Sequence, residues 1–285
     1  MKKIILLLGI MALGSISFAA DCETLYCAEP YSLTSNVSRF FSNVTGQNFL
    51  AEKIGESLTK KAIKKNIISG NIKVNLDSYS VRDLKAGKFK SLEITGKDVN
   101  VQGVYISYFN AKTLCDFNYI VQDKQGNVTV KEDIPVAFKT EITEEDLNKT
   151  MNSSDYKRLL NDINSIGGNF NIFQITSTNV KLKNGKMYYV MKYAMPFMRK
   201  SQEVVISADL CVDKGKIVLA DTSLVNNNLS LDVNKFSRIL NYINPLDFSA
   251  KILENKDARF NIENVKISDK KITVDGRMTV LKDKE

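Results

Sequence analysis

Few residues in this chain could carry out chemistry, because its 285 residues include no histidine. The usual general base and the serine–histidine triad are therefore excluded. Glu144 and Glu145 are adjacent carboxylates, but neighbours along a helix do not face each other across a substrate. Ser57 and Lys61 are four residues apart on a predicted helix and could form a lysine-activated serine, although such pairs arise by chance in lysine-rich helices. We expect a protein without catalytic activity.

The four cysteines are the other reactive groups, at Cys22, Cys27, Cys115 and Cys211. An even number suggests two disulfides in an oxidising compartment, and four cysteines allow three connectivities. We predict the pairs Cys22–Cys27 and Cys115–Cys211, with four free thiols as the alternative where exported thiols are not oxidised. The spacing is not that of a metal site and histidine is missing, so we expect neither a metal nor another cofactor.

The N-terminal sequence predicts export. Lys2 and Lys3 precede an apolar run over residues 4–18, and small residues at Ser17 and Ala19 fit cleavage after Ala19, giving a signal peptide at 1–19. An uncleaved anchor is the alternative, and lipidation at Cys22 is disfavoured by the preceding Asp21. We expect the mature protein in the periplasm or on the outer face of the cell envelope.

The net charge of +8 bears on the choice of partner. An exported chain rarely meets nucleic acid, so we expect none as a partner. Anionic lipid headgroups or cell-wall polymers fit the charge better, and transient contact with an anionic membrane surface is one such partnership. Simple solubility is the alternative reason for the charge.

Helical spacing is clearest between residues 37 and 68. Leu50, Ile54, Leu58 and Ala62 recur every fourth residue and define an apolar face, with glutamates and lysines elsewhere. Such a helix could lie on a membrane, plug a curved sheet or pack on a sheet in the ordinary way. Further helices are predicted over 143–168, with Thr143 as N-cap, Asp146 three residues later and a break near 152–154, and over 233–242.

Strands dominate the rest of the chain. Between Ser80 and Ser107, short alternating apolar runs are separated by glycines, which is typical of a half-buried antiparallel sheet. The alternation slips at Gln102-Gly103, where we predict a β-bulge that bends the sheet. Asn184-Gly185 and Ser268–Lys271 predict tight turns. The organisation is α+β, with an irregular cysteine-containing segment at 20–36 and a single domain at 37–285.

Between Ser80 and Ser107, Asp83-Leu84, Gly87-Lys88, Gly96 and Gly103 follow one another, and ITEEDLNK at Ile142–Lys149 and ADLCVDKGKIVLAD at Ala208–Asp221 come later in the chain. These features resemble the LmeA-like phospholipid-binding family of the bacterial envelope. The resemblance covers about Ile67 to Val280, and its motifs are turns and patterns rather than a chemical site. It implies a TULIP-like fold, in which a strongly curved antiparallel sheet wraps around a long amphipathic helix and encloses an apolar groove. The four cysteines depart from the family pattern.

A phospholipid, or another lipid with acyl chains, is therefore the expected ligand. The candidate groove residues are the inward apolar sets of the first strands and the helix, with two methionines that suit variable acyl chains: Leu50, Ile54, Leu58, Leu92, Ile94, Val99, Val101, Val104, Ile106, Met191 and Met195. The alternative function is a non-catalytic envelope scaffold or chaperone whose core is filled. The sequence does not indicate the lipid or the oligomeric state.

Overall fold

A computed structural model describes residues 27–36, 38–40, 47–64, 67–122, 128–169, 174–195, 200–226, 243–246, 248–249 and 258–283. The predicted signal peptide, Cys22 and the helix predicted over 233–242 lie outside these residues.

Antiparallel sheet makes up most of the described chain. A six-stranded sheet has the order β1-β3-β4-β7-β13-β12. Its strands are β1 (Ser69–Asp77), β3 (Ser91–Val101), β4 (Val104–Thr113), β7 (Ile134–Thr143), β12 (Ala258–Ser268) and β13 (Lys271–Val280). A small sheet of three strands packs beside it and comprises β2 (Lys88–Phe89), β5 (Asn118–Gln122) and β6 (Val128–Val130).

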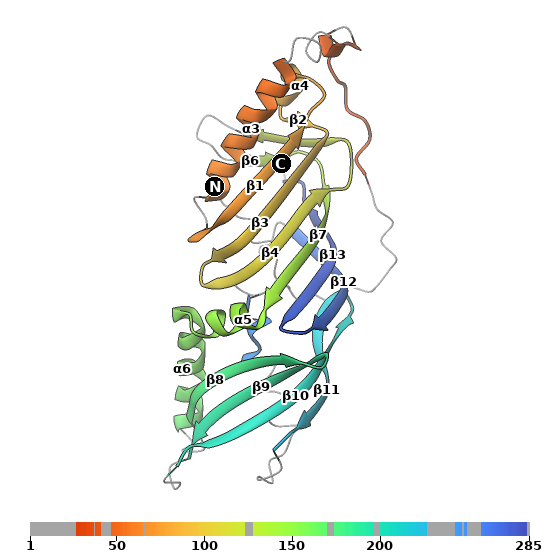
Figure 1. Cartoon of the computed structure of the whole chain (residues 1–285). Helices are drawn as coiled ribbons and strands as arrows, with labels where there is room; N and C mark the ends of the chain where they lie inside the picture. The colour runs from red at the N-terminus through yellow and green to blue at the C-terminus, as the bar shows by residue number, and fades with distance from the viewer. Residues whose placement is uncertain are drawn as a thin grey trace.

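A second large sheet follows in the order β11-β10-β9-β8. It consists of β8 (Gln174–Lys183), β9 (Lys186–Ala194), β10 (Gln202–Asp213) and β11 (Lys216–Leu224). The molecule is elongated, with the six-stranded sheet at one end and the four-stranded sheet at the other, and β12 lies against β10 and β11 where the two sheets meet (Figure 1). The predicted α+β class and the antiparallel pairing are confirmed.

The turn between β3 and β4 corrects one prediction. Gln102 and Gly103 have φ of 50° and 86°, and they form the two-residue turn of a hairpin rather than a β-bulge. Because both central residues need positive φ, glycine at position 103 fits this turn. The change in the alternation of buried residues lies instead near Asp98, where φ is 52°. The predicted turn at Asn184-Gly185 is confirmed, with φ of 53° and 73°.

The predicted helix over 143–168 is also confirmed, as two helices. α5 (Glu144–Met151) begins at a complete capping box, in which the Thr143 side chain accepts from Asp146 N and the Asp146 carboxylate accepts from Thr143 N. The chain then breaks at Asn152–Ser153 and continues as α6 (Ser154–Asn169). α6 flanks the four-stranded sheet (Figure 1).

The first long helix lies on the outside of the six-stranded sheet. α3 (Gln47–Lys64) runs along β1 and the short α4 (Val81–Lys85), on the flank of the molecule (Figure 1). The close approach depends on Gly55, because a Cβ there would come within 2.6 Å of the Leu76 side chain. The expected wrapping of the sheet around this helix is not confirmed.

The disulfide pairing predicted from the sequence was wrong. Cys27 bonds to Cys115, with their Cα atoms 5.6 Å apart, and Cys211 is free and exposed. The reason is the placement of the N-terminal segment, where Tyr31 donates a hydrogen bond to the carbonyl of Asn118 on β5 at 2.9 Å. Cys211 lies on β10, paired with Val218 in the other large sheet, so it does not meet Cys115.

Candidate functional site

The predicted groove residues of the first strands lie together in the core. The hairpin of β3 and β4 brings Ile94 opposite Ala111, Val99 opposite Ile106 and Val101 opposite Val104. Six of the predicted side chains are buried and belong to one continuous apolar cluster: Leu92, Ile94, Val99, Val101, Val104 and Ile106. Each is at most 6% exposed, so other atoms of the protein already cover these side chains, and their contact with an acyl chain stays a prediction.

The two predicted methionines contact the same cluster from the other large sheet. Met191 on β9 is fully buried, and the partly buried Met195 packs against the cluster just after β9 ends. The apolar interior is thus continuous from the β3–β4 hairpin to β9. Phe109 and Tyr193 are also fully buried in it, and sequence reasoning did not single them out.

The helix residues predicted to form the groove wall lie elsewhere. Leu50, Ile54 and Leu58 are 60–63% exposed on the solvent side of α3. On the opposite side, Glu56 bonds to β1 at Leu76, Glu52 bonds to Ser78 just after β1, and Ile63 is buried in the core. The helix thus packs on the sheet partly through glutamates that the sequence suggested would be solvated. These three residues are not brought together with the buried set.

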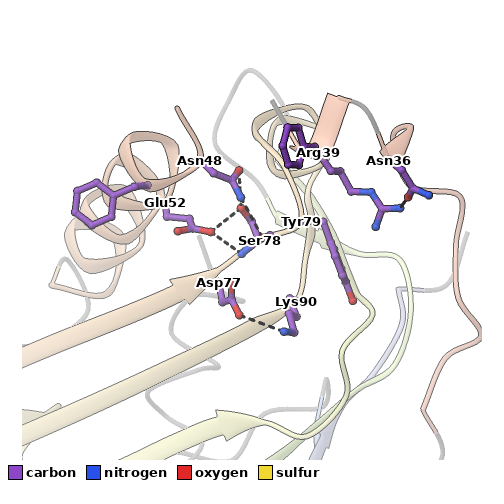
Figure 2. Close-up of a pocket in the computed structure, with 10 residues that line it drawn as sticks. Asn36, Arg39, Asn48, Glu52, Asp77, Ser78, Tyr79 and Lys90 are labelled. Atoms are coloured by element: carbon purple, nitrogen blue, oxygen red, sulfur yellow. Dashed lines mark hydrogen bonds and ion pairs between the residues drawn. The ribbon is translucent and has the colours of Figure 1, made fainter. Parts of the chain in front are cut away.

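A hollow of about 650 Å³ lies between the start of α3 and the chain that follows β1. Figure 2 shows Asn48 and Glu52 reaching from α3 toward Ser78, where the Glu52 carboxylate accepts from Ser78 N at 2.8 Å. The Lys90 ammonium lies 3.8 Å from the Asp77 carboxylate on one wall of the hollow, and Arg39 also lines it. The walls therefore carry both signs of charge.

Aromatic rings complete this hollow. Phe40 and Phe49 both line it, and both are at least 60% exposed, so they also belong to the molecular surface. Tyr79 stacks on Phe117 with ring centroids 5.7 Å apart. A mixed polar and aromatic hollow of this size suits the polar part of an amphipathic ligand better than its acyl chains. Nothing in the sequence pattern marked it, because its residues come from four separate segments.

Asp83, a residue of the family-like motif, anchors the N-terminal segment. Its carboxylate accepts from Thr34 N at 3.0 Å and from the hydroxyls of Thr34 and Ser80 at 2.9 and 2.6 Å. Burial disfavours the charged form, but these hydrogen bonds outweigh it and lower the Asp83 pKa below its ordinary value. The charged Asp83 carboxylate thus has a structural role, because it holds the segment around Thr34 against α4.

A pair of buried tyrosines links α6 and the four-stranded sheet to residue 243. The hydroxyls of Tyr156 on α6 and Tyr189 on β9 lie 2.9 Å apart, and Tyr156 also donates to the carbonyl of Ile243. Burial raises the pKa of both tyrosines well above their usual value. The shift favours the protonated hydroxyls that these hydrogen bonds require.

The carboxylates considered for chemistry have structural partners. Glu144 accepts from Leu182 N at 2.7 Å, which links α5 to β8, and Glu145 pairs with Lys149 at 2.7 Å on the surface of α5. Within the described ranges, no group of three or more cysteine or acidic side chains could hold a metal ion. No described helix combines the length and the apolar character needed to span a bilayer.

A second hollow, of about 720 Å³, crosses β8, β9 and β10. Lys181, Lys183 and Lys192 line it together with Tyr188 and Glu203. Lys192 lies 3.8 Å from Glu203, so part of this positive charge is balanced within the sheet.

Comparison with curated proteins and with solved structures found no match to this chain. Comparison with protein families did: the family described as LmeA-like phospholipid-binding matches residues 46–277. This range starts just before α3 and ends within β13, so it takes in both large sheets and the buried apolar cluster that joins them. Because the match covers most of the chain and confirms the resemblance seen in the sequence, the chain belongs to the LmeA-like phospholipid-binding family.

Proposed function

We propose that this protein holds the acyl chains of a phospholipid against its apolar interior and carries or presents that lipid in the cell envelope. The observation that carries the proposal is the family match over residues 46–277. The continuous apolar cluster between the β3–β4 hairpin and β9 is the interior that would take the acyl chains, and because its side chains are buried against one another, it would have to open to admit them.

The physical need for such a protein is large. A diacyl phospholipid has roughly thirty methylenes, and each costs about 0.8 kcal/mol when it is exposed to water. A lipid therefore does not cross an aqueous compartment alone at a useful concentration, and a carrier must cover its chains. The mixed-charge hollow beside Phe49 would then take the polar headgroup, because Arg39 and Lys90 can face phosphate while Glu52 and Asp77 can face an ammonium group.

We place this activity outside the cytoplasm. The apolar run after Lys2 and Lys3 supports export, and the Cys27–Cys115 bond fits an oxidising compartment. N-terminal sequencing of the mature protein should give a start after Ala19. A chain that retains Met1 and fractionates with the cytoplasm would contradict the export proposal.

Lipid extraction is the direct test of the proposed function. The protein is purified gently, extracted with organic solvent, and the extract is analysed by mass spectrometry. Co-purifying phospholipid in near-stoichiometric amount is expected. Its absence would favour the scaffold alternative.

A volume change in the interior distinguishes a lipid-filled space from a filled core. Val104→Phe on β4 adds volume inside the predicted groove. If lipid occupies that space, the variant loses co-purifying lipid and keeps its thermal stability. If side chains already fill it, the variant is destabilised by about 1–3 kcal/mol. Val274→Phe on β13, a buried valine outside the predicted set, is the matched control and should be destabilised in either case.

A further inference from the structure

Exposed apolar side chains are concentrated on one part of the surface. Eight large apolar residues of the described chain are exposed, and four of them lie on α3. A fifth lies four positions after its end, and a sixth lines the hollow beside its start. The six are Phe40, Phe49, Leu50, Ile54, Leu58 and Ile68, each at least 60% exposed. Scattered single residues of this kind are normal, but a concentration on one helix indicates an interaction surface.

The acidic and basic side chains of α3 lie on different sides of the helix. Its two acidic residues turn toward β1, where Glu52 accepts from Ser78 N at 2.8 Å and Glu56 accepts from Leu76 N at 3.2 Å. Its four lysines are all on the exposed side: Lys53, Lys60, Lys61 and Lys64. Lys53 also pairs with Glu56 at 2.6 Å. The solvent side of α3 therefore combines an apolar stripe with positive charge from Lys60, Lys61 and Lys64, while both glutamates bond toward the sheet.

We propose that the solvent side of α3 is the surface by which this protein docks on an anionic lipid bilayer. An apolar stripe bordered by lysines is the pattern of a helix that lies in the plane of a membrane interface. The lysines complement anionic headgroups, and Leu50, Ile54 and Leu58 enter the acyl boundary. At 18 residues α3 is about 27 Å long, so it would lie along the surface rather than cross it.

The position of the mixed-charge hollow supports this surface. Phe49 belongs both to the apolar side of α3 and to the lining of the hollow, and exposed Phe40 lines the same hollow. A bilayer in contact with α3 would bring lipid headgroups next to Arg39 and Lys90. This inference deepens the proposed function, since a phospholipid carrier has to reach a membrane, but it is tested by a separate measurement.

Vesicle binding tests the surface directly. Full-length mature protein is sedimented with vesicles of phosphatidylcholine, or of equimolar phosphatidylcholine and phosphatidylglycerol. We expect binding to the mixed vesicles, weaker binding to phosphatidylcholine alone, and a decrease with added salt because headgroup attraction is screened. The double variant Ile54→Ser/Leu58→Ser should lower the partition coefficient by about tenfold or more, with an unchanged circular dichroism spectrum.

Matched control variants distinguish binding through α3 from nonspecific adsorption to vesicles. Leu114→Ser/Val225→Ser removes the two exposed apolar side chains that lie away from α3 and should leave binding unchanged. Lys60→Glu/Lys61→Glu should weaken binding to the anionic vesicles, whereas Lys181→Glu/Lys183→Glu, with the same change in net charge in the second hollow, should not. Equal effects from both lysine pairs, or loss of binding only in the second pair, would overturn the proposal.

Two further outcomes would also overturn it. If the α3 variants convert a wild-type dimer into a monomer and leave vesicle binding intact, the stripe is covered by a second copy. If wild-type protein does not bind the anionic vesicles at all, the surface is not a membrane contact. The proposed function is tested separately, by the lipid that co-purifies with the protein. If lipid co-purifies but the α3 variants bind vesicles as the wild type does, only this inference is refuted. If no lipid co-purifies but vesicle binding depends on α3, only the carrier function is refuted.

Discussion

The Cys27–Cys115 disulfide allows a quantitative prediction about stability. The bond joins residues separated by 88 positions, and α3, β1, β3 and β4 all lie inside the closed loop. In the chain-entropy description, opening such a loop raises the entropy of the unfolded chain by about 15 cal/mol/K, which is about 4.6 kcal/mol near room temperature. For a protein of ordinary stability, about 5–15 kcal/mol, this loss is a large part of the total.

The measurement needs a background with two cysteines. Cys22→Ser and Cys211→Ser leave Cys27 and Cys115 alone, and adding Cys27→Ser then removes the bond. Urea unfolding followed by far-ultraviolet circular dichroism should give a free energy of unfolding that is lower by about 3–5 kcal/mol for the added change. Cys211→Ser by itself should have no measurable effect, because that thiol is exposed and unpaired.

Two results would refute this reasoning. Thiol titration of the two-cysteine background in urea without reductant should detect no free thiol; two free thiols would mean that Cys27 and Cys115 are not bonded. A loss in the free energy of unfolding below about 1 kcal/mol would mean that the N-terminal segment unfolds separately from the sheet. The bond would then not restrict the part of the chain that unfolds cooperatively.

Three further changes have defined outcomes. Thr143→Ala breaks the capping box with Asp146 at the start of α5 and should cost about 1 kcal/mol in urea unfolding, whereas Thr143→Ser should cost much less; equal losses would contradict the capping role. Asp83→Asn removes a carboxylate whose pKa in the folded protein lies below its ordinary value of 3.8. The charged carboxylate therefore stabilises the fold fully above pH 3.8, and this stabilisation is lost as the pH falls through the folded pKa. The gap in melting temperature between wild type and this variant should therefore be largest near neutral pH and narrow in acid, and a gap independent of pH would be inconsistent with the shift. Gly96→Ala places a Cβ against the ring of Phe109 across the β3–β4 pair and should destabilise by about 1–3 kcal/mol, with partial recovery in Gly96→Ala/Phe109→Leu; no recovery would exclude this clash as the cause.

Local chemistry in this chain was predictable from the sequence. Thr143 with Asp146 and Asn184-Gly185 each act through residues a few positions away, so the pattern contains the whole interaction. Gln102-Gly103 shows the limit of such reasoning, because a slip in alternation indicates that the strand is interrupted without saying whether the chain bulges or reverses. The turn geometry decides this, and both residues have positive φ.

Interactions between distant segments were not predictable. Cys27 meets Cys115 because Tyr31 and Thr34 fix the N-terminal segment beside β5 and α4, and no spacing in the sequence encodes that placement. The orientation of α3 was missed for a related reason. Periodicity identifies the apolar face of a helix, but it does not say what covers that face. Here Glu56 bonds to the backbone of β1 and Glu52 to the backbone of Ser78, just after β1.

The bonding of those two glutamates has a consequence for self-association. β1 is the terminal strand of the six-stranded sheet, and a strand in that position offers unsatisfied amides to any other chain that can add to it. The Glu56 carboxylate occupies one of these amides, at Leu76, Glu52 occupies the amide of Ser78 just past the strand's end, and α3 packs beside them. The helix thus blocks the addition of a further strand at this edge. A change that detaches α3 from β1 would expose the edge and promote aggregation.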